Sequence, residues 1–395
     1  MNDYKIINNL LIRCTSQDKI CTIPETITCI DRGAFEGNSF IQNVKIPNSV
    51  EIVKPSAFSN CVNLETVKLS SKLTEIEYGL FKNCYNLKEI KGIDNIRIIN
   101  KKAFSCCLSL TEFTIPKKLE FIYKSVFENC KNLEKIIVDD NNNHYKSLDG
   151  VLYNNDLTKL ILYPAGKKGE SFEIPSFVKE IEENAFEYNC YLKKVKFNNQ
   201  ITNVPQYCFH GCEALEEVIF SEKIDKINQY AFSKCKSLIN INLPNSLKII
   251  SNNAFEKCNR FINIVLPNGI HSLYERVFLN CVNLEYIKLS EKLKYISKEA
   301  FKNCIKLNKI VFTNPCEKLG ENIFEGIEKE FTIEYNGTLN QWEELISPKE
   351  ECVFHPTLND FHYYGDSVDK YVPTIYETKC IISDKIKYNL ICKGK

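Results

Sequence analysis

The stretch INLPNSLKIISNNAFEKC, residues 241–258, decides the fold because its pattern recurs along most of the chain. Its Ala-Phe pair ends at Phe255, and the same pair or a close variant ends at eleven further positions. These positions are Phe35, Phe58, Phe81, Phe104, Phe127, Phe186, Phe209, Phe232, Phe278, Phe301 and Phe324. Every step along the series is 23 residues except one. A fixed period of this length predicts a repeat array in which each unit packs against its neighbours.

The other apolar residues keep a constant distance from each Phe. Cys usually comes three residues after it, Leu six after, and Ile, Val or Leu nine and eleven after, as in Leu64, Val67 and Leu69. Val67 and Leu69 are two residues apart and share one face of a strand, so each unit predicts one strand with a buried face. The Ala-Phe pair and the Cys predict a short helical turn on the opposite side. Stacked units would join the strands into one parallel sheet.

One step of the series is 59 residues long, which is two periods plus 13 residues. Tyr163 takes the missing Phe position, so the extra residues come before it. Residues 151–153 and 159–163 are strand-like and flank the turn-prone residues 154–156. The sequence therefore predicts a β-hairpin insertion at about residues 139–171 that projects from the array.

Both ends of the array differ in composition from its middle. We expect an N-terminal cap at residues 1–22, repeats of 23 residues at 23–335, and a C-terminal capping segment at 336–395. The last segment holds Trp342 and further aromatic residues that could cover the open end of a stack. These residues are Phe354, Phe361, Tyr363, Tyr364 and Tyr371. The predicted fold class is an α/β repeat solenoid, a curved rod with a parallel sheet on its concave face, one inserted β-hairpin and a C-terminal cap.

The pattern AFxxCxxLxxIxIPxxLxxIxxxAF resembles the BspA-type leucine-rich repeat, also called the Treponema pallidum type, over about residues 23–335. The stretch SLDGVLYNNDLTKLILYPAGKK, residues 147–168, resembles a hairpin common in that family. The stretch IEYNGTLNQWEEL, residues 333–345, resembles the segment that often closes its arrays. The resemblance implies a leucine-rich-repeat solenoid, and a role in adhesion to host proteins or at the cell surfaces of bacteria and anaerobic protists.

The charge balance excludes several classes of partner. Lys and Arg number 51 and Asp and Glu number 50, and the two signs alternate along the chain. Such a balance creates no field that attracts nucleic acid or an anionic membrane. Asp3 stands where a secretion signal would be basic, and no stretch approaches the roughly 18 to 20 apolar residues of a spanning helix. We expect a cytoplasmic protein; the alternative is the cell surface, or secretion by a route not visible in the sequence.

Nine of the 19 cysteines share one position in the repeat. They are Cys61, Cys84, Cys107, Cys130, Cys212, Cys235, Cys258, Cys281 and Cys304. Side chains in such a column would lie parallel inside the stack, where a free Cys packs as a small apolar group with a raised pKa. We expect reduced packing cysteines rather than disulfides. A metal site is not expected, because tetrahedral sites converge from short local spacings.

The histidines give no sign of a catalytic set. His144, His210, His271, His355 and His362 occupy different phases of the array or lie outside it. There is also no Gly-rich phosphate loop, and residues 336–395 are few for an enzyme domain. We therefore expect no catalytic residue, no metal and no cofactor.

The outward face of the predicted sheet is the candidate binding surface. Residues ten positions after each Phe lie between two buried positions and should point outward. Lys dominates this row in the N-terminal part, whereas apolar residues appear in the C-terminal part. The candidate partner-binding residues are Ile219, Asn242, Val265, Tyr286, Lys288 and Val311. An exposed apolar patch with a polar rim often marks a binding site; the alternative is ordinary β-propensity of Ile and Val.

These observations favour a non-enzymatic module that binds a protein partner on the concave face of the solenoid, in host or cell-surface interaction. The inserted hairpin is a candidate second contact, because loops that interrupt a regular scaffold often carry recognition. The alternatives are a structural scaffold that self-assembles and, third, an enzyme with a catalytic C-terminal tail. The identity of the partner and the oligomeric state do not follow from the sequence.

Overall fold

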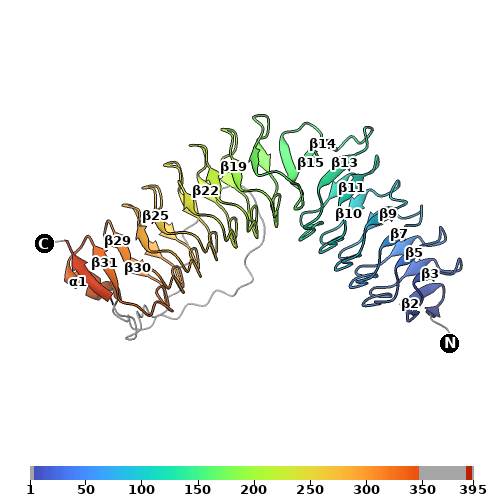
Figure 1. Cartoon of the computed structure of the whole chain (residues 1–395), viewed down its shortest axis with the longest axis horizontal. Coiled ribbons are helices and arrows are strands. Elements are labelled where there is room, and N and C mark those ends of the chain that lie inside the picture. Colours follow the sequence, from blue (N-terminus) through green and yellow to red (C-terminus); the bar gives the residue numbers. More distant parts are fainter. Residues whose placement is uncertain (1–3, 347–387, 394–395) are drawn as a thin grey trace. The chain divides into compact units, whose positions relative to one another are not determined.

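The structure, a computed structural model, describes residues 4–346 and 388–393. It divides into unit 1, Met1–Asn242, and unit 2, Leu243–Lys395. Each unit is a stack of short turns of chain, and most turns contribute two strands that pair in parallel with the turns before and after (Figure 1). The chain is a parallel-strand solenoid.

In unit 1, one series of strands lies at the positions that follow each conserved Leu. Its first sheet contains β3 (Ile20–Thr22), β5 (Asn43–Lys45), β7 (Thr66–Lys68) and β9 (Glu89–Lys91). The next contains β11 (Glu112–Ile115) and β13 (Lys135–Val138), and the last contains β17 (Ser171–Glu173), β19 (Lys194–Lys196), β21 (Glu217–Ile219) and β23 (Asn240–Ile241). Residues one period apart are partners, as in Val44, Val67 and Ile90.

A second series of strands runs along the other side of unit 1. It begins with β1 (Tyr4–Ile7), β2 (Leu10–Cys14), β4 (Cys29–Ile30) and β6 (Ile52–Val53), followed by β8 (Glu75–Ile76), β10 (Ile98–Ile99) and β12 (Phe121–Ile122). It continues with β14 (Tyr145–Leu148), β15 (Val151–Asn154), β16 (Lys159–Leu162) and β18 (Glu180–Ile181), then β20 (Asn203–Val204) and β22 (Lys226–Ile227). Most of these strands are only two residues long.

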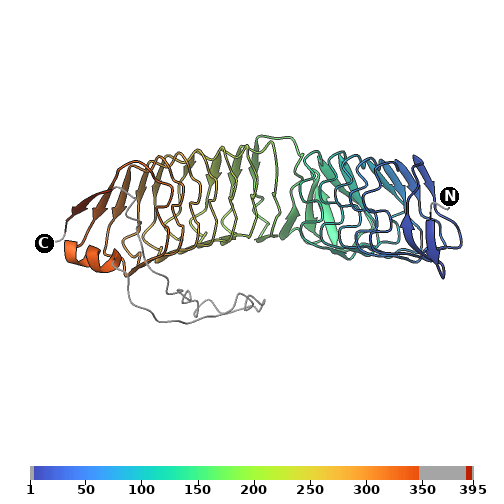
Figure 2. The ribbon, with the colours of Figure 1, turned by 90° about the horizontal axis from the view of Figure 1, so that it is seen from below.

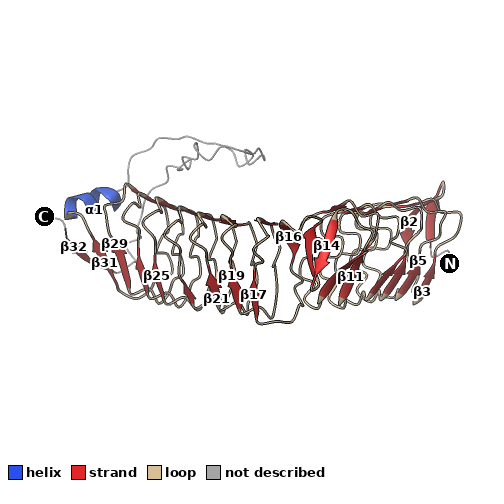
Figure 3. Cartoon of the chain, turned by 90° about the horizontal axis from the view of Figure 1, so that it is seen from above, coloured by secondary structure: helices blue, strands red, loops and turns tan. Residues whose placement is uncertain are grey.

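Unit 2 repeats this plan. One sheet contains β25 (Asn263–Val265), β27 (Tyr286–Lys288), β29 (Lys309–Phe312), β31 (Phe331–Tyr335) and β32 (Tyr388–Cys392). The other series contains β24 (Ile249–Ile250), β26 (Ser272–Leu273), β28 (Tyr295–Ile296) and β30 (Lys318–Leu319). The helix α1 (Leu339–Ile346) lies beside the last turns of this unit (Figure 3).

The expectation of a helical turn at each Ala-Phe pair was wrong, and the term α/β overstates the helix content. Within the described residues α1 is the one α-helix. Ser56 and Asn60, on either side of Phe58, have positive φ values of 60° and 61°. The N–H groups of Phe58 and Asn60 donate to Leu80 and Lys82 of the following turn, at 3.1 and 2.7 Å. Because these donors bond between turns, they cannot bond four residues back within an α-helix.

The core of each unit contains a column of aromatic rings. In unit 1, Phe58, Phe81 and Phe104 are fully buried and stacked, with ring centroids 5.7 and 5.6 Å apart. In unit 2, Phe278 stacks between Phe255 and Phe301 at 5.7 and 5.8 Å. Figure 2 shows how closely successive turns of each unit follow one another. A Phe in most turns therefore fills the same place in the core from one turn to the next.

The cysteine column lies beside these rings. The thiol of Cys61 donates to the carbonyl of Phe35 at 3.1 Å, and the thiol of Cys84 donates to that of Phe58 at 3.1 Å. Burial raises the pKa of Cys61 to about 12. The seventeen cysteines among the described residues carry no disulfide. The column thus consists of packing groups, most of whose thiols donate to a backbone carbonyl.

The interruption of the repeats is built from three strands. β14 pairs antiparallel with β15, β15 pairs antiparallel with β16, and β16 pairs in parallel with β18. The prediction that this segment projects was wrong for its central side chains, because Val151, Leu152, Tyr153 and Leu160 are buried. An apolar strand pair gains free energy when its side chains join the core rather than face water.

Residues from two parts of the sequence pack together in the last turns of unit 2. Trp342 of α1 is buried, and its ring lies 5.6 Å from Phe312 and 5.1 Å from Tyr335. Its Nε1–H donates to the hydroxyl of Tyr388 in β32 at 3.4 Å. Five aromatic residues and two histidines named in the sequence analysis lie outside the described residues. They are Phe354, Phe361, Tyr363, Tyr364, Tyr371, His355 and His362.

We predict that Phe81→Ala lowers the free energy of unfolding by about 3–5 kcal/mol, because it leaves a cavity between two stacked rings. Lys82→Ala, next to it in the chain and on the surface side of the turn, should change stability by less than about 0.5 kcal/mol. Urea unfolding followed by circular dichroism measures both changes. Equal effects of the two substitutions would contradict the role given to the ring column.

Candidate functional site

The six candidate residues are divided between the two units. Ile219 ends β21 of unit 1, where it is half-buried and pairs with Lys196 of β19. Asn242 is exposed just after β23. Val265, Tyr286, Lys288 and Val311 belong to unit 2. These four are the candidate residues that unit 2 alone brings together.

In unit 2, the candidate residues lie on the outward face of three neighbouring strands. Parallel register makes Val265 of β25 the partner of Lys288 in β27, and Lys288 the partner of Val311 in β29. Val265 is 59% exposed, whereas Ile264 next to it is 2% exposed. Tyr286 is half-buried in the adjacent row, beside Asn263 and Lys309. The row is therefore apolar, cationic and apolar in order, with a tyrosine at its side.

Charged residues lie at the β31 side of this row. Glu334 is the register partner of Val311 and accepts from Lys309 at 2.5 Å and from Lys393 at 2.9 Å. Hydrogen bonds from Lys309 and Lys393 lower the pKa of Glu334 below its usual value. Lys309 lies in β29, Glu334 lies in β31, and Lys393 comes directly after β32. Both ion pairs therefore connect different parts of the sheet. This group holds a carboxylate between two cations at the border of the apolar row.

A concavity of about 440 Å³ adjoins the row where β29 and β31 end. Val311, Glu334 and Lys393 form part of its wall, together with Thr313 and Asn336. The hydroxyl of Thr313 donates to the carbonyl of Leu289 at 3.0 Å, and the amide of Asn336 donates to the carbonyl of Thr313 at 2.7 Å. The wall is mostly polar and its side chains are held in place by the backbone of neighbouring turns.

Sequence reasoning missed several residues of this surface. Glu334 and Lys393 were not candidates, because their pairing depends on β32, which returns to the sheet from a distant part of the chain. Ile262, just before β25, is 43% exposed and was also missed. The sequence did contain a sign of this residue. Phe261 takes the conserved Leu position and is buried, and the residue after that position is usually polar, whereas here it is Ile262.

The site contains the chemistry of a contact surface. Among the described residues, no three His, Cys, Asp or Glu side chains converge as metal ligands. His271 of unit 2 is exposed, with its Nδ1 atom 2.9 Å from the carbonyl oxygen of Gly269. No helix in residues 4–346 and 388–393 combines the length and apolar composition of a transmembrane segment. The surface offers apolar contact, paired charges and backbone-anchored amides.

Comparison with protein-family models places six copies of the BspA-type leucine-rich repeat region on this chain, at residues 5–147, 165–259 and 204–330. A search among curated proteins finds no match.

Several solved structures are similar to this chain. A leucine-rich repeat protein from Eubacterium ventriosum matches with a TM-score of 0.63 and 26% identity, over 72% of this chain and 82% of that one. The pneumococcal vaccine antigen PcpA matches with a TM-score of 0.62 and 21% identity, over 88% of this chain and 94% of that one. A leucine-rich cell surface protein from Faecalibacterium prausnitzii matches with a TM-score of 0.57 and 23% identity, over 87% and 96%.

We predict that Glu334→Gln weakens the pH dependence of stability below about pH 5. A carboxyl whose folded-state pKa is lowered adds stability above its unfolded-state pKa and loses it as pH falls through the lowered value. Because the pair lies near the surface, the loss should stay below about 1 kcal/mol. Urea unfolding between pH 3 and pH 7 compares the two chains at each pH. Identical pH profiles would show that the two lysines do not stabilise the folded state through Glu334.

Proposed function

Because the chain belongs to the BspA-type leucine-rich repeat family, we propose that it is a non-enzymatic module that binds a protein partner on the outward strand face of unit 2. Its family is a repeat-scaffold type and not a known enzyme family. The observation that carries the proposal is the row Val265, Lys288 and Val311, with an exposed valine on one strand and a concavity beside another.

The arrangement matches the usual composition of protein interfaces. Such interfaces combine an apolar centre containing aromatic residues with a polar rim that remains hydrated. Val265, Val311 and Tyr286 supply the centre, and the ion pairs of Glu334 supply a rim. Single exposed apolar residues are common on any surface. Here the exposed Val265 and the half-buried Val311 lie two strands apart on the same row, and this arrangement favours a contact surface over chance.

Other features of the interpretation stay predictions. Ile219 and Asn242 would extend the contact only if the partner also binds unit 1. The cytoplasm stays the predicted compartment, with the cell surface or secretion as the alternative. Three further expectations also stay predictions. They are that this face is concave, that the C-terminal segment acts as a cap, and that the repeats are bounded at residues 22 and 335.

We predict that Val265→Glu combined with Val311→Glu weakens capture of the partner, because each change places a carboxylate in the apolar centre of the contact, where losing its hydration costs free energy. The matched control is Ile137→Glu, which changes an exposed isoleucine at the equivalent position of β13 in unit 1. Binding should fall at least about tenfold for the double variant and stay unchanged for the control. Ile219→Glu, tested separately, shows whether unit 1 contributes.

The measurement is affinity capture with the full chain from lysates of its own cells and of host cells, with quantitative mass spectrometry of the bound proteins. Circular dichroism confirms that each variant folds. A partner retained equally by the double variant would overturn the proposed surface. Light scattering after gel filtration tests the alternative that the chain is a scaffold that self-assembles. If the pure chain assembles and the double variant does not, this face would serve self-association instead.

A further inference from the structure

Two cysteines outside the cysteine column lie in the first turn of unit 1. Cys14 ends β2 and Cys21 lies in β3, near the N-terminal end of the chain (Figure 1). The N–H of Cys14 donates to the carbonyl of Ala34 at 2.8 Å, and in the next turn the N–H of Phe35 donates to the carbonyl of Ala57 at 2.8 Å. Cys14 therefore takes, in the first turn, the place that a Phe of the ring column takes in the second.

Cys21 takes the strand position of the same turn. It is the register partner of Val44, which comes nine residues after Phe35. In a later turn the residues at these two positions are Phe104 and Phe113, whose ring centroids lie 5.1 Å apart in the core. The first turn thus has two thiols at positions where a later turn has two neighbouring aromatic rings.

The two thiols are in contact with each other. The thiol of Cys14 donates a hydrogen bond to the sulfur of Cys21. Tyr4 of β1 is the antiparallel register partner of Cys14, and its hydroxyl lies 3.3 Å from the same sulfur. The thiols of Cys61 and Cys84 in the column donate to backbone carbonyls instead. Cys14 and Cys21 therefore form a dithiol, in which one sulfur faces the other.

The surroundings of Cys21 favour its thiolate. The hydrogen bond from Cys14 lowers the pKa of Cys21 below its usual value; burial acts in the opposite direction, and the hydrogen bond from Tyr4 lowers the pKa again. In the column, by contrast, burial raises the pKa of Cys61 and of Cys304 to about 12. Because the thiolate is the form that attacks a disulfide, Cys21 is a better nucleophile than these thiols of the column.

A small reagent can reach the pair by local opening of β1. Cys14 and Cys21 are buried, with exposed fractions of 4% and 1%. Tyr4 contacts Cys21 from β1, which is mostly exposed and, in the described part of the chain, pairs with β2 alone. Terminal strands of this kind open locally at a small cost in free energy. Opening of β1 removes Tyr4 from Cys21 while the later turns stay folded.

We propose that Cys14 and Cys21 are a redox modification site, which a small-molecule disulfide such as oxidised glutathione converts to an internal disulfide. The thiolate of Cys21 attacks one sulfur of the reagent, forms a mixed disulfide and releases the first thiolate of the reagent. The thiolate of Cys14 then attacks the sulfur of Cys21 and releases the second. The two cysteines lose two electrons and two protons, and the reagent is reduced to two thiols. The site lies in unit 1 and does not depend on the function proposed for unit 2.

The new bond would hold the first turn of unit 1 closed. It joins β2 of one strand series to β3 of the other, across residues 14–21. The terminal turn of a stack is the one that opens most easily, because it has a neighbouring turn on one side only. A short covalent loop removes many of the open conformations of such a turn.

The first test maps the bond in the full chain, incubated with oxidised glutathione at about pH 8 and then denatured and alkylated. A bond between the two cysteines links the tryptic peptides 14–19 and 20–32. Mass spectrometry should show this linked pair forming at least about tenfold faster than a disulfide between any two cysteines of the column. The exposed Cys190 reports whether the reagent is active. Alkylated Cys14 and Cys21 in a chain whose Cys190 carries glutathione would overturn the proposal.

The variant Cys14→Ser removes the second thiol of the pair. Oxidation should then stop at the mixed disulfide of Cys21 with glutathione, because no thiol is in place to release it. The matched control is Cys29→Ser, which changes a half-buried cysteine within the same tryptic peptide as Cys21 and should leave the linked pair unchanged. Circular dichroism checks that both variants fold. Alkylated Cys21 in Cys14→Ser, or loss of the linked pair in Cys29→Ser, would contradict the assignment.

Hydrogen–deuterium exchange provides a second readout, on the natural chain. Exchange of backbone amides in residues 4–30 should slow at least about threefold on oxidation and recover when dithiothreitol reduces the bond, because the bond suppresses opening of the first turn. Amides of unit 2 should not change, and Cys14→Ser treated in the same way should show no slowing. Equal exchange of the reduced and oxidised chains in residues 4–30 would overturn the role given to the bond.

Discussion

Hydrogen bonding from each turn to the next is the constraint on which this structure depends. Phe58, Phe81 and Phe104 donate their N–H groups to the following turn at 2.8 to 3.1 Å, and Cys thiols donate to Phe carbonyls of the preceding turn. A turn alone would leave these groups without partners, which is costly inside a protein. The period of 23 residues matters because it places these donors opposite acceptors of the neighbouring turn, and rings, thiols and strands stay in register only while it holds.

The sequence predicted the repeat period and one strand in each unit, and missed the second strand and the strand that returns from the C-terminal end. The strands containing Val67 and Val195 followed from apolar residues two apart. The second strands were overlooked, because a two-residue strand such as Glu75–Ile76 has no alternation to recognise. The helical turns were expected wrongly, because the pattern shows which residues are buried and not where their N–H groups donate. β32 could not be found either, since its partner β31 lies more than fifty residues earlier.

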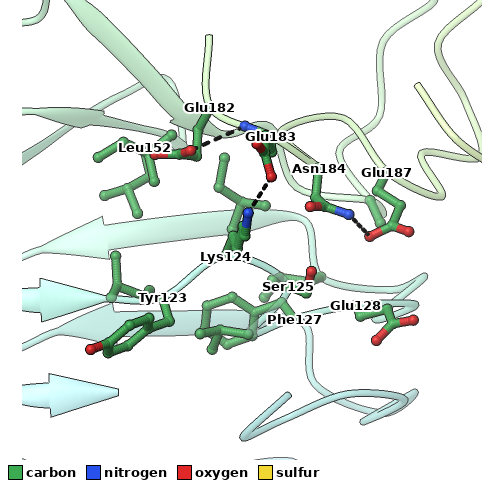
Figure 4. Close-up of a pocket in the computed structure, with 16 residues that line it drawn as sticks. Tyr123, Lys124, Ser125, Phe127, Glu128, Leu152, Glu182, Glu183, Asn184 and Glu187 are labelled. Carbon is green, nitrogen blue, oxygen red and sulfur yellow. Dashed lines mark hydrogen bonds and ion pairs between the residues drawn. The ribbon is translucent and has the colours of Figure 1, made fainter. Parts of the chain in front are cut away.

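The candidate sites show the same limit. The outward position of Val265 and Val311 followed from counting along the repeat, and this counting also named Lys288. The concavity beside Val311 depends on how β31 and β32 end, and the small cavity lined by Phe127 and Leu152 depends on how an insertion of irregular length fits between two turns (Figure 4). Neither shape is encoded by a local pattern. Both occur where the regular array is disturbed, and so it is there that the surface can differ from one turn to the next.

The contacts between neighbouring turns also determine how such a chain can change in evolution. Removing one whole period, such as residues 62–84, would bring Phe58 next to Phe104 and leave every remaining group facing a partner of the same kind. Removing a number of residues that is not a multiple of 23 would shift the later turns out of register with the ring column. Duplication and loss in multiples of 23 are therefore the neutral steps for this architecture. The array can therefore gain or lose whole repeats without disturbing its core. An irregular insertion such as the one before Tyr163 must instead form strands of its own whose apolar side chains become buried.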